Sequence, residues 1–164
     1  MQTIWITGGS SGIGFATAKE FINNNWQVVI SSSNKIKLES AKKKLELNNN
    51  KNLVHAIVCD ISSKNNVDET INSIEKNIGK IDIALLNASA YSPNKNQIFD
   101  ISNYELLVDV NIKGTLYCVN KLKDVMKNRN NTIAIISSPL GYRGWPTAGA
   151  VSYTHLTLPT IHRV

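Results

Sequence analysis

A glycine cluster near the amino terminus is the first feature of the sequence whose residues and spacing can do chemistry. Residues 7–14 read Thr-Gly-Gly-Ser-Ser-Gly-Ile-Gly, after a short apolar run and before a segment with helical spacing. Gly8 permits a tight turn, Gly12 lets a ligand approach the backbone, and Gly14 allows close helix packing. The two serines can donate hydroxyl hydrogen bonds, and the helix start carries a partial positive charge. This context predicts a cradle for the pyrophosphate of a dinucleotide rather than a plain turn.

The rest of the chain alternates apolar runs with helical segments. The predicted strands are 3–7, 28–30, 53–58, 81–86 and 132–137. The predicted helices are 13–24, 35–47, a segment capped by Ser62 or Ser63 that ends near 77, and 101–127 with a break near 113–114. Such alternation predicts an α/β fold with a Rossmann-like, doubly wound parallel sheet joined by right-handed crossovers. The strands are almost wholly apolar, which indicates helices on both faces, and ligands bind such sheets beyond the carboxyl ends of the strands.

The order of the polar motifs resembles the short-chain dehydrogenase/reductase family over nearly all of residues 1–150. Residues 7–14 fit its Thr-Gly-x-x-x-Gly-x-Gly turn, and 58–61 (Val-Cys-Asp-Ile) look like the end of its third strand. Residues 86–89 (Leu-Asn-Ala-Ser) look like its Asn-Asn-Ala-Gly segment, with a leucine and a serine as departures. Residues 109–111 (Asp-Val-Asn) match its helix asparagine, and 136–138 (Ile-Ser-Ser) match the strand that ends in its catalytic serine.

The resemblance implies roles for individual residues. Asp60 is expected to face the adenine amino group, Ser138 to polarise the substrate oxygen, and Asn111 to anchor a water in a proton relay. Each also has a purely structural interpretation: Asp60 as a helix cap, Asn87 as a backbone hydrogen-bonding group, Asn111 as a solvent-facing helix residue and Ser138 as a turn hydroxyl. The full set of expected cofactor-binding residues is Thr7, Gly8, Ser10, Ser11, Gly12, Ile13, Gly14, Ser33, Asp60, Ile61, Asn87, Ala88 and Ser89.

The end of the second predicted strand bears on the choice between NAD and NADP. An acid at that place would bind the ribose 2′-hydroxyl and repel a 2′-phosphate. Here the chain reads Ile-Ser-Ser-Ser-Asn-Lys over 30–35, without an acid and without an arginine. The sequence therefore favours NADP, with NAD as the alternative. Lys35 and Lys37 are near enough to approach a phosphate, although we expect both to project from the start of the helix.

The acid–base pair that the resemblance leads us to expect is missing. In the family, a tyrosine exchanges the proton, and a lysine four residues later lowers its pKa and holds the nicotinamide ribose. Counting thirteen residues on from Ser138 reaches Val151, and the lysine position falls on His155. The nearest tyrosine, Tyr153, lies two positions late, and no lysine follows Lys127. The chain as given is therefore expected to be inactive. The later strands and helices that the resemblance implies are also absent, and the unfinished sheet edge and helix faces are expected to make the chain poorly soluble.

Residues 151–164 read as a foreign tail. The first ten resemble the translation of a common transposon-based sequencing adapter, and an index followed by a fixed codon accounts for the remainder. The bias toward asparagine and lysine also disappears there. We therefore expect a dinucleotide-binding domain over 1–150, incomplete at its carboxyl end, and a non-native tail. The alternative is a genuine divergent terminus in which Tyr153 or His155 acts as the base.

Composition limits the other functional classes. The net charge of +6 comes largely from helix lysines, and no nucleic-acid motif accompanies it. Cys59 and Cys118 lie far apart without a metal-binding pattern, which predicts burial rather than a metal or redox site. The chain has no long apolar run and no secretory signal, so we expect a cytoplasmic protein that contacts neither membrane nor nucleic acid.

The expected function is nicotinamide-dependent oxidation or reduction of a small carbonyl or alcohol substrate by a parent protein that forms a homo-oligomer. The alternative is a non-catalytic dinucleotide-binding protein.

Overall fold

A computed structural model of the chain describes residues 1–47, 51–91, 101–139 and 142. The strands are β1 (Thr3–Thr7), β2 (Gln27–Ser32), β3 (Val54–Val58), β4 (Ile81–Leu86) and β5 (Thr132–Ile135). The helices are α1 (Gly12–Asn23), α2 (Lys35–Glu46), η1 (Lys51–Leu53), α3 (Lys64–Asn77), α4 (Ile101–Leu107), η2 (Val108–Gly114) and α5 (Thr115–Val125). The predicted tail 151–164 lies outside the described residues, and so do the positions expected for the tyrosine and lysine.

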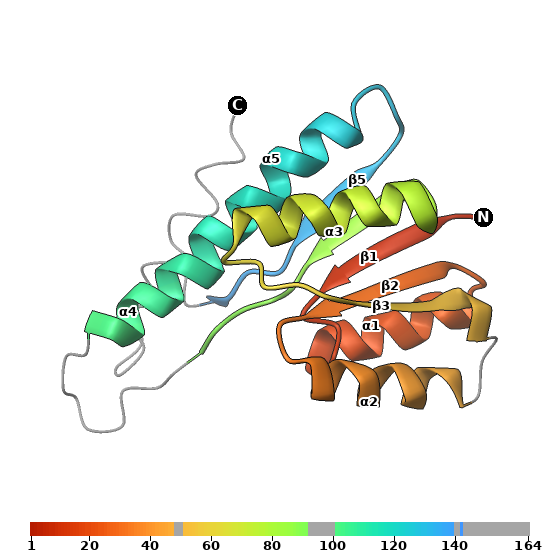
Figure 1. Cartoon of the computed structure of the whole chain (residues 1–164), viewed down its shortest axis with the longest axis horizontal. Coiled ribbons are helices and arrows are strands. Elements are labelled where there is room, and N and C mark those ends of the chain that lie inside the picture. Colours follow the sequence, from red (N-terminus) through yellow and green to blue (C-terminus); the bar gives the residue numbers. More distant parts are fainter. Residues whose placement is uncertain (48–50, 92–100, 140–141, 143–164) are drawn as a thin grey trace.

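The five strands form one parallel sheet in the order β3-β2-β1-β4-β5. The order reverses direction between β1 and β4, so their carboxyl ends form the switch point at which a crevice opens. Helices α1 and α2 cover one face, whereas α3 and α5 cover the other (Figure 1). The predicted parallel, doubly wound architecture is therefore confirmed.

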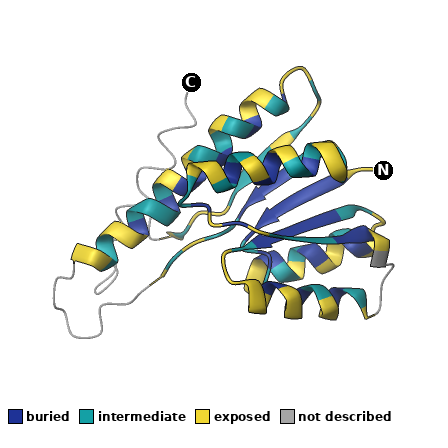
Figure 2. Ribbon diagram, viewed as in Figure 1, coloured by how far each residue is buried: buried dark blue, intermediate teal, exposed yellow. Residues whose placement is uncertain are grey.

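Alternation along each strand divides the buried side chains into two cores. On β1, Ile4 and Ile6 face α1 and α2, whereas Trp5 faces α3 and α5, and all three are at most 1% exposed. The period of two that characterises a strand accounts for this division. Figure 2 shows the result as a buried sheet between helices whose outer faces are exposed. Cys59 and Cys118 lie in the second core, where burial raises the pKa of both thiols, in agreement with the predicted structural role.

The helical segment before β5 differs in detail from its prediction. Instead of a break near 113–114, a π-helical stretch from Val108 to Gly114 joins α4 to α5. Gly114 packs so closely on Ile61 that a Cβ there would lie 2.8 Å from the Ile61 Cγ1. Such π-helical turns are wider than α-helical turns and are frequent at functional sites. Asn111 lies within this stretch.

A chain of polar contacts crosses the amino-terminal edge of the sheet. The Thr3 amide donates to Asp82 Oδ2 (2.8 Å), and the Thr3 hydroxyl donates to Gln27 Oε1 (3.3 Å). The Gln27 amide nitrogen then lies 3.1 Å from His55 Nε2. Because an amide nitrogen only donates, this geometry requires an unprotonated His55 Nε2.

Stability is therefore expected to depend on pH through His55. Burial, followed by the nearby Lys42 charge, lowers the pKa of His55, so the unfolded chain binds the proton more tightly than the folded chain. The stability that neutral His55 contributes is complete above the pKa of histidine in the unfolded chain, about 6.5. It is lost as the pH falls below that pKa toward the lower pKa of the folded chain. Urea unfolding at pH 7.5 and pH 5.5 should show a smaller decrease for His55→Gln than for the parent chain. Equal decreases would contradict this role.

Candidate functional site

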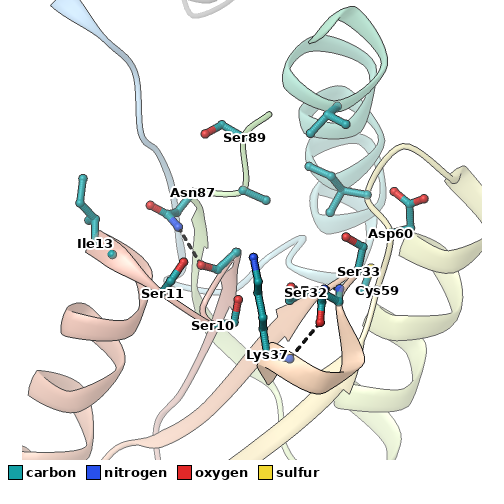
Figure 3. A pocket seen from close by; sticks show the side chains of 16 residues that line it. Ser10, Ser11, Ile13, Ser32, Ser33, Lys37, Cys59, Asp60, Asn87 and Ser89 are labelled. Atoms are coloured by element: carbon teal, nitrogen blue, oxygen red, sulfur yellow. Dashed lines mark hydrogen bonds between the residues drawn. The ribbon is translucent and has the colours of Figure 1, made fainter. Parts of the chain in front are cut away.

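A hollow of about 560 Å³ opens at the carboxyl end of the sheet, beside the switch point (Figure 3). Its walls come from the segments that follow β1, β2, β3 and β4. The lining residues are Gly8, Ser10, Ser11, Gly12, Ile13, Ser32, Ser33, Asn34, Lys37, Cys59, Asp60, Ile61, Asn87, Ala88, Ser89 and Val110. The structure thus brings together all the residues expected to bind a cofactor except Thr7 and Gly14, which lie outside this lining.

Gly8, Gly12 and Gly14 of the motif are required for different structural reasons. Gly8 has φ +65°, and a Cβ there would lie 2.8 Å from the Ala88 Cα. A Cβ on Gly14 would lie 2.7 Å from Asn87 Nδ2. Gly12 has φ +55°, yet a Cβ there would meet no atom within 4 Å. The first two positions join the turn to the segment after β4, whereas Gly12 presents bare backbone to the hollow.

The start of α1 adds to the case for an anionic ligand. Asn34 caps α2 by accepting from the Lys37 amide, and Ser63 caps α3 by accepting from the Asn66 amide. Ser11 precedes α1 in an extended conformation, but its side chain makes no such cap. Ser11 therefore leaves the first amides of α1 without a side-chain cap, and the positive end of the helix dipole lies at the hollow, where an anion is favoured. The donor set and the uncrowded Gly12 fit a pyrophosphate.

Thr7 and Asn87 hold the turn against the end of β4. The Thr7 hydroxyl oxygen accepts from the Asn87 and Ala88 amides, both at 3.0 Å. The Asn87 side chain donates in return to the Thr7 and Gly8 carbonyls at 3.1 and 3.2 Å. The backbone-binding interpretation of Asn87 is thus seen directly, and its position on the hollow leaves the cofactor role as a prediction.

Asp60 lies at the opposite wall of the hollow (Figure 3). Its Oδ1 accepts from the Ser62 amide at 3.0 Å and from the Ser62 hydroxyl at 2.7 Å. Asp60 is not the cap of α3, because Ser63 has that role. The carboxylate is exposed and is oriented by a turn of its own backbone, as an acceptor for an adenine amino group would need to be.

Asn111 is 4% exposed, which excludes the solvent-facing interpretation. Its Oδ1 accepts from the Ala90 amide at 2.8 Å, and its Nδ2 donates to the Ala90 carbonyl at 3.0 Å. The side chain therefore clamps the segment after β4 to η2. The Asn111 carbonyl accepts the Thr115 hydroxyl at 2.9 Å. A relay water at Asn111 remains a prediction.

Ser138 lies three residues beyond β5 and is half-buried. The Ile136 amide donates to the Leu86 carbonyl at 3.0 Å, which keeps this segment beside the end of β4. Ser138 is not among the residues that line the described hollow. The structure thus places both expected catalytic residues at the carboxyl edge of the sheet, but neither Asn111 nor Ser138 is among the residues that line the hollow.

Of the two lysines that the sequence offered as phosphate partners, Lys37 lines the hollow and Lys35 does not. The Lys37 side chain is drawn between those of Ser10 and Ser33 in Figure 3. The Asn34 cap makes Lys37 the third residue of α2, and helical side chains lean toward the amino terminus. The lysine therefore reaches back over the turn after β2. The cap motif at Asn34 was the signal that could have shown this.

Comparison with known protein families identifies proteins that are similar to this chain. The model of the short chain dehydrogenase family matches residues 2–154. The chain belongs to this family. Among family relatives, an uncharacterized oxidoreductase of Staphylococcus saprophyticus is 30% identical over 126 residues, which are 77% of this chain and 53% of the relative. An uncharacterized oxidoreductase of Staphylococcus aureus is 29% identical over 157 residues, covering 95% of this chain and 66% of the relative.

Solved structures of family members share the fold. A short chain dehydrogenase from Bacillus anthracis superposes with a TM-score of 0.90 at 22% identity, over 98% of this chain and 64% of that one. A short-chain dehydrogenase/reductase from Brucella melitensis gives 0.88 at 20% identity, over 98% and 66%. The chain thus spans about half to two thirds of the length of the curated relatives. None of the helices in the described ranges is long and apolar enough to span a bilayer.

Proposed function

We propose that the chain is the dinucleotide-binding part of an NAD(P)-dependent oxidoreductase that interconverts a small carbonyl compound and its alcohol. The observation that carries the proposal is the bare backbone at Gly12, which faces a hollow at the switch point of the sheet beside the uncapped start of α1. Serine hydroxyls from the segments after β1, β2 and β4 line the same hollow, at Ser10, Ser11, Ser32, Ser33 and Ser89. Pyrophosphate binding needs this combination of close approach and convergent donors.

The residues divide the cofactor between them as follows. The turn over 8–14 holds the pyrophosphate, and Asp60 with Ile61 receives the adenine. Asn87, Ala88 and Ser89 form the wall toward the reacting end. The bound nicotinamide supplies or accepts the hydride. Ser138 then orients the substrate oxygen, and Asn111 fixes the segment that ends at Ala90.

NADP is the cofactor that we favour. Ser32, Ser33 and Asn34 form the wall after β2 and bring no carboxylate, whereas Lys37 brings a cation to the same wall. An ammonium group is a good partner for a phosphate, and the absence of an acid removes the repulsion that a 2′-phosphate would meet. NAD is the alternative.

Replacing Lys37 with Gln is expected to weaken binding of 2′,5′-ADP about fivefold to tenfold and to leave 5′-AMP binding nearly unchanged, because only the former carries the 2′-phosphate. Titration calorimetry at constant ionic strength measures both affinities. Lys43→Gln is the matched control, since Lys43 lies on the same helix but not on the hollow. An equal loss for both ligands, or tighter binding of 5′-AMP by the parent chain, would contradict the NADP preference.

A non-catalytic role as a dinucleotide-binding protein is the second candidate. The sequence favours it through Val151, which stands where the resemblance predicts the tyrosine, and through the lack of any lysine after Lys127. Sequencing the native gene across codon 150 separates the candidates. A tyrosine codon at 151 followed by lysine at 155 supports the enzyme and a non-native tail. The present codons would show that the tail is native and would leave the binding protein and an enzyme that uses Tyr153 or His155 as its base.

The remaining proposals concern the location, substrate class and assembly of the protein. We propose a cytoplasmic location, a small-molecule substrate and a homo-oligomeric parent, with neither nucleic acid nor membrane as partner. The positive charge does not argue against this, because the lysines of α2 and α3 lie in ordinary helix positions, two of them paired with acids four residues later. Size-exclusion chromatography of the full-length protein tests the assembly.

A further inference from the structure

A second hollow of about 510 Å³ lies between α1 and α2, on the far side of the wall that Ser10, Ser11 and Lys37 form. These three residues face both hollows. The remaining lining joins Phe15 of α1 to a stripe along α2. We call this hollow the α1–α2 groove. Its size falls within the range of small-molecule sites.

The stripe on α2 follows from helical spacing. Lys37, Ala41 and Lys44 are four and three residues apart, which places them on one face of the helix. Ile36 is 84% exposed at the same end, and Phe15 supplies an aromatic wall opposite. Leu38, Ala41 and Leu45 belong to the core and are at most 3% exposed, so Ala41 lies where the core meets the groove. The groove therefore has an apolar floor in which Ala41 and Phe15 also pack with the core, whereas the exposed Ile36 does not belong to the core.

The charge of the groove is positive. Within the described part of the chain, neither Lys37 nor Lys44 lies within salt-bridge distance of a carboxylate, whereas Lys42 pairs with Glu46 on the neighbouring face. No acid lines the groove, and the Ser10, Ser11 and Ser40 hydroxyls add donors. An apolar floor with cations at its rim is complementary to a molecule that joins an anion to an apolar body.

We propose that the α1–α2 groove binds a small apolar anion, such as an alkyl phosphate, and that this ligand competes with the cofactor 2′-phosphate for Lys37. The second part rests on the proposed cofactor function, since it needs a 2′-phosphorylated nucleotide in the neighbouring hollow. One lysine serves both sites, so an anion in the groove weakens the attraction for a phosphate on the other side of the wall. A nucleotide without the 2′-phosphate does not need Lys37 and should bind independently.

Calorimetry with decyl phosphate below its micelle-forming concentration tests the site. Decyl phosphate should bind to the chain, whereas inorganic phosphate and decanol, each with half of the required chemistry, should bind far more weakly. Lys44→Gln is expected to weaken decyl phosphate about fivefold, and the matched control Lys43→Gln to leave it unchanged. Equal effects of the two substitutions, or no binding of decyl phosphate, would overturn the proposal.

Competition with nucleotides tests the coupling. Saturating decyl phosphate should weaken 2′,5′-ADP about fivefold and leave 5′-AMP unchanged. An equal loss for both nucleotides would mean that the probe enters the cofactor hollow, which overturns the separate groove. If decyl phosphate binds with the expected dependence on Lys44 but neither nucleotide binds, the proposed cofactor function fails and the groove stands.

Discussion

Gly12→Asp is expected to reduce dinucleotide binding a hundredfold or more, about the effect of placing a like charge against a phosphate. A Cβ on Gly12 would meet no atom within 4 Å, and Gly12 lines the hollow, so we expect the new carboxylate to lie at the hollow without a clash. It then stands at the start of α1, where the pyrophosphate would otherwise receive the helix amides. Quenching of tryptophan fluorescence or calorimetry with NADP and NAD measures the loss.

Gly12→Asn is the matched control for this prediction. Asparagine has nearly the same shape as aspartate and tolerates positive φ, so both variants carry similar strain at φ +55°. Their thermal midpoints should agree, and the asparagine variant should lose binding only through its bulk. If aspartate binds the cofactor as well as asparagine does, no phosphate lies at Gly12, and the site proposal fails.

Much of the fold was predictable because it depends on local patterns. Strands 3–7 and 81–86 were placed correctly, since their apolar residues must lie between two helical layers. Helix 35–47 was predicted one residue longer than the observed Lys35–Glu46, where ends fray. The candidate site followed from the same logic, because the polar residues that follow parallel strands meet at one edge.

What the sequence did not reveal depends on packing and long-range contacts. The π-helical stretch around Asn111 is set by the clamp to Ala90 and by the contact between Gly114 and Ile61, which join parts distant in sequence. Gly9 also escaped notice, although a Cβ there would lie 2.7 Å from Ile30 Cγ2. The second strand was predicted as 28–30 but runs from Gln27 to Ser32, because parallel pairing with both neighbours extends it past its apolar centre.

Trp5 contributes more to the packing of the core than the sequence alone predicts. A tryptophan in a short apolar run predicts only a strand, but this side chain is 0% exposed in the central strand. Its cross-strand neighbours are Ala84 on β4 and Val29 on β2. The alanine leaves room for the indole on that face, and the indole Nε1 donates to the Ser31 Oγ at 3.1 Å. Volume and hydrogen bond are therefore both satisfied at one buried position.

Trp5→Ala is accordingly expected to lower the free energy of unfolding by about 3–5 kcal/mol, through lost burial and the cavity that remains. That loss is a large fraction of the roughly 5–15 kcal/mol by which native proteins are stable, so the urea midpoint of the variant should fall clearly. Urea titration followed by circular dichroism measures it. Trp26→Ala is the control, because Trp26 is half-buried and makes an edge contact with Phe21 at a ring distance of 5.0 Å. The control should lose much less stability. Equal losses would contradict the prediction that Trp5 anchors the core between β1, α3 and α5.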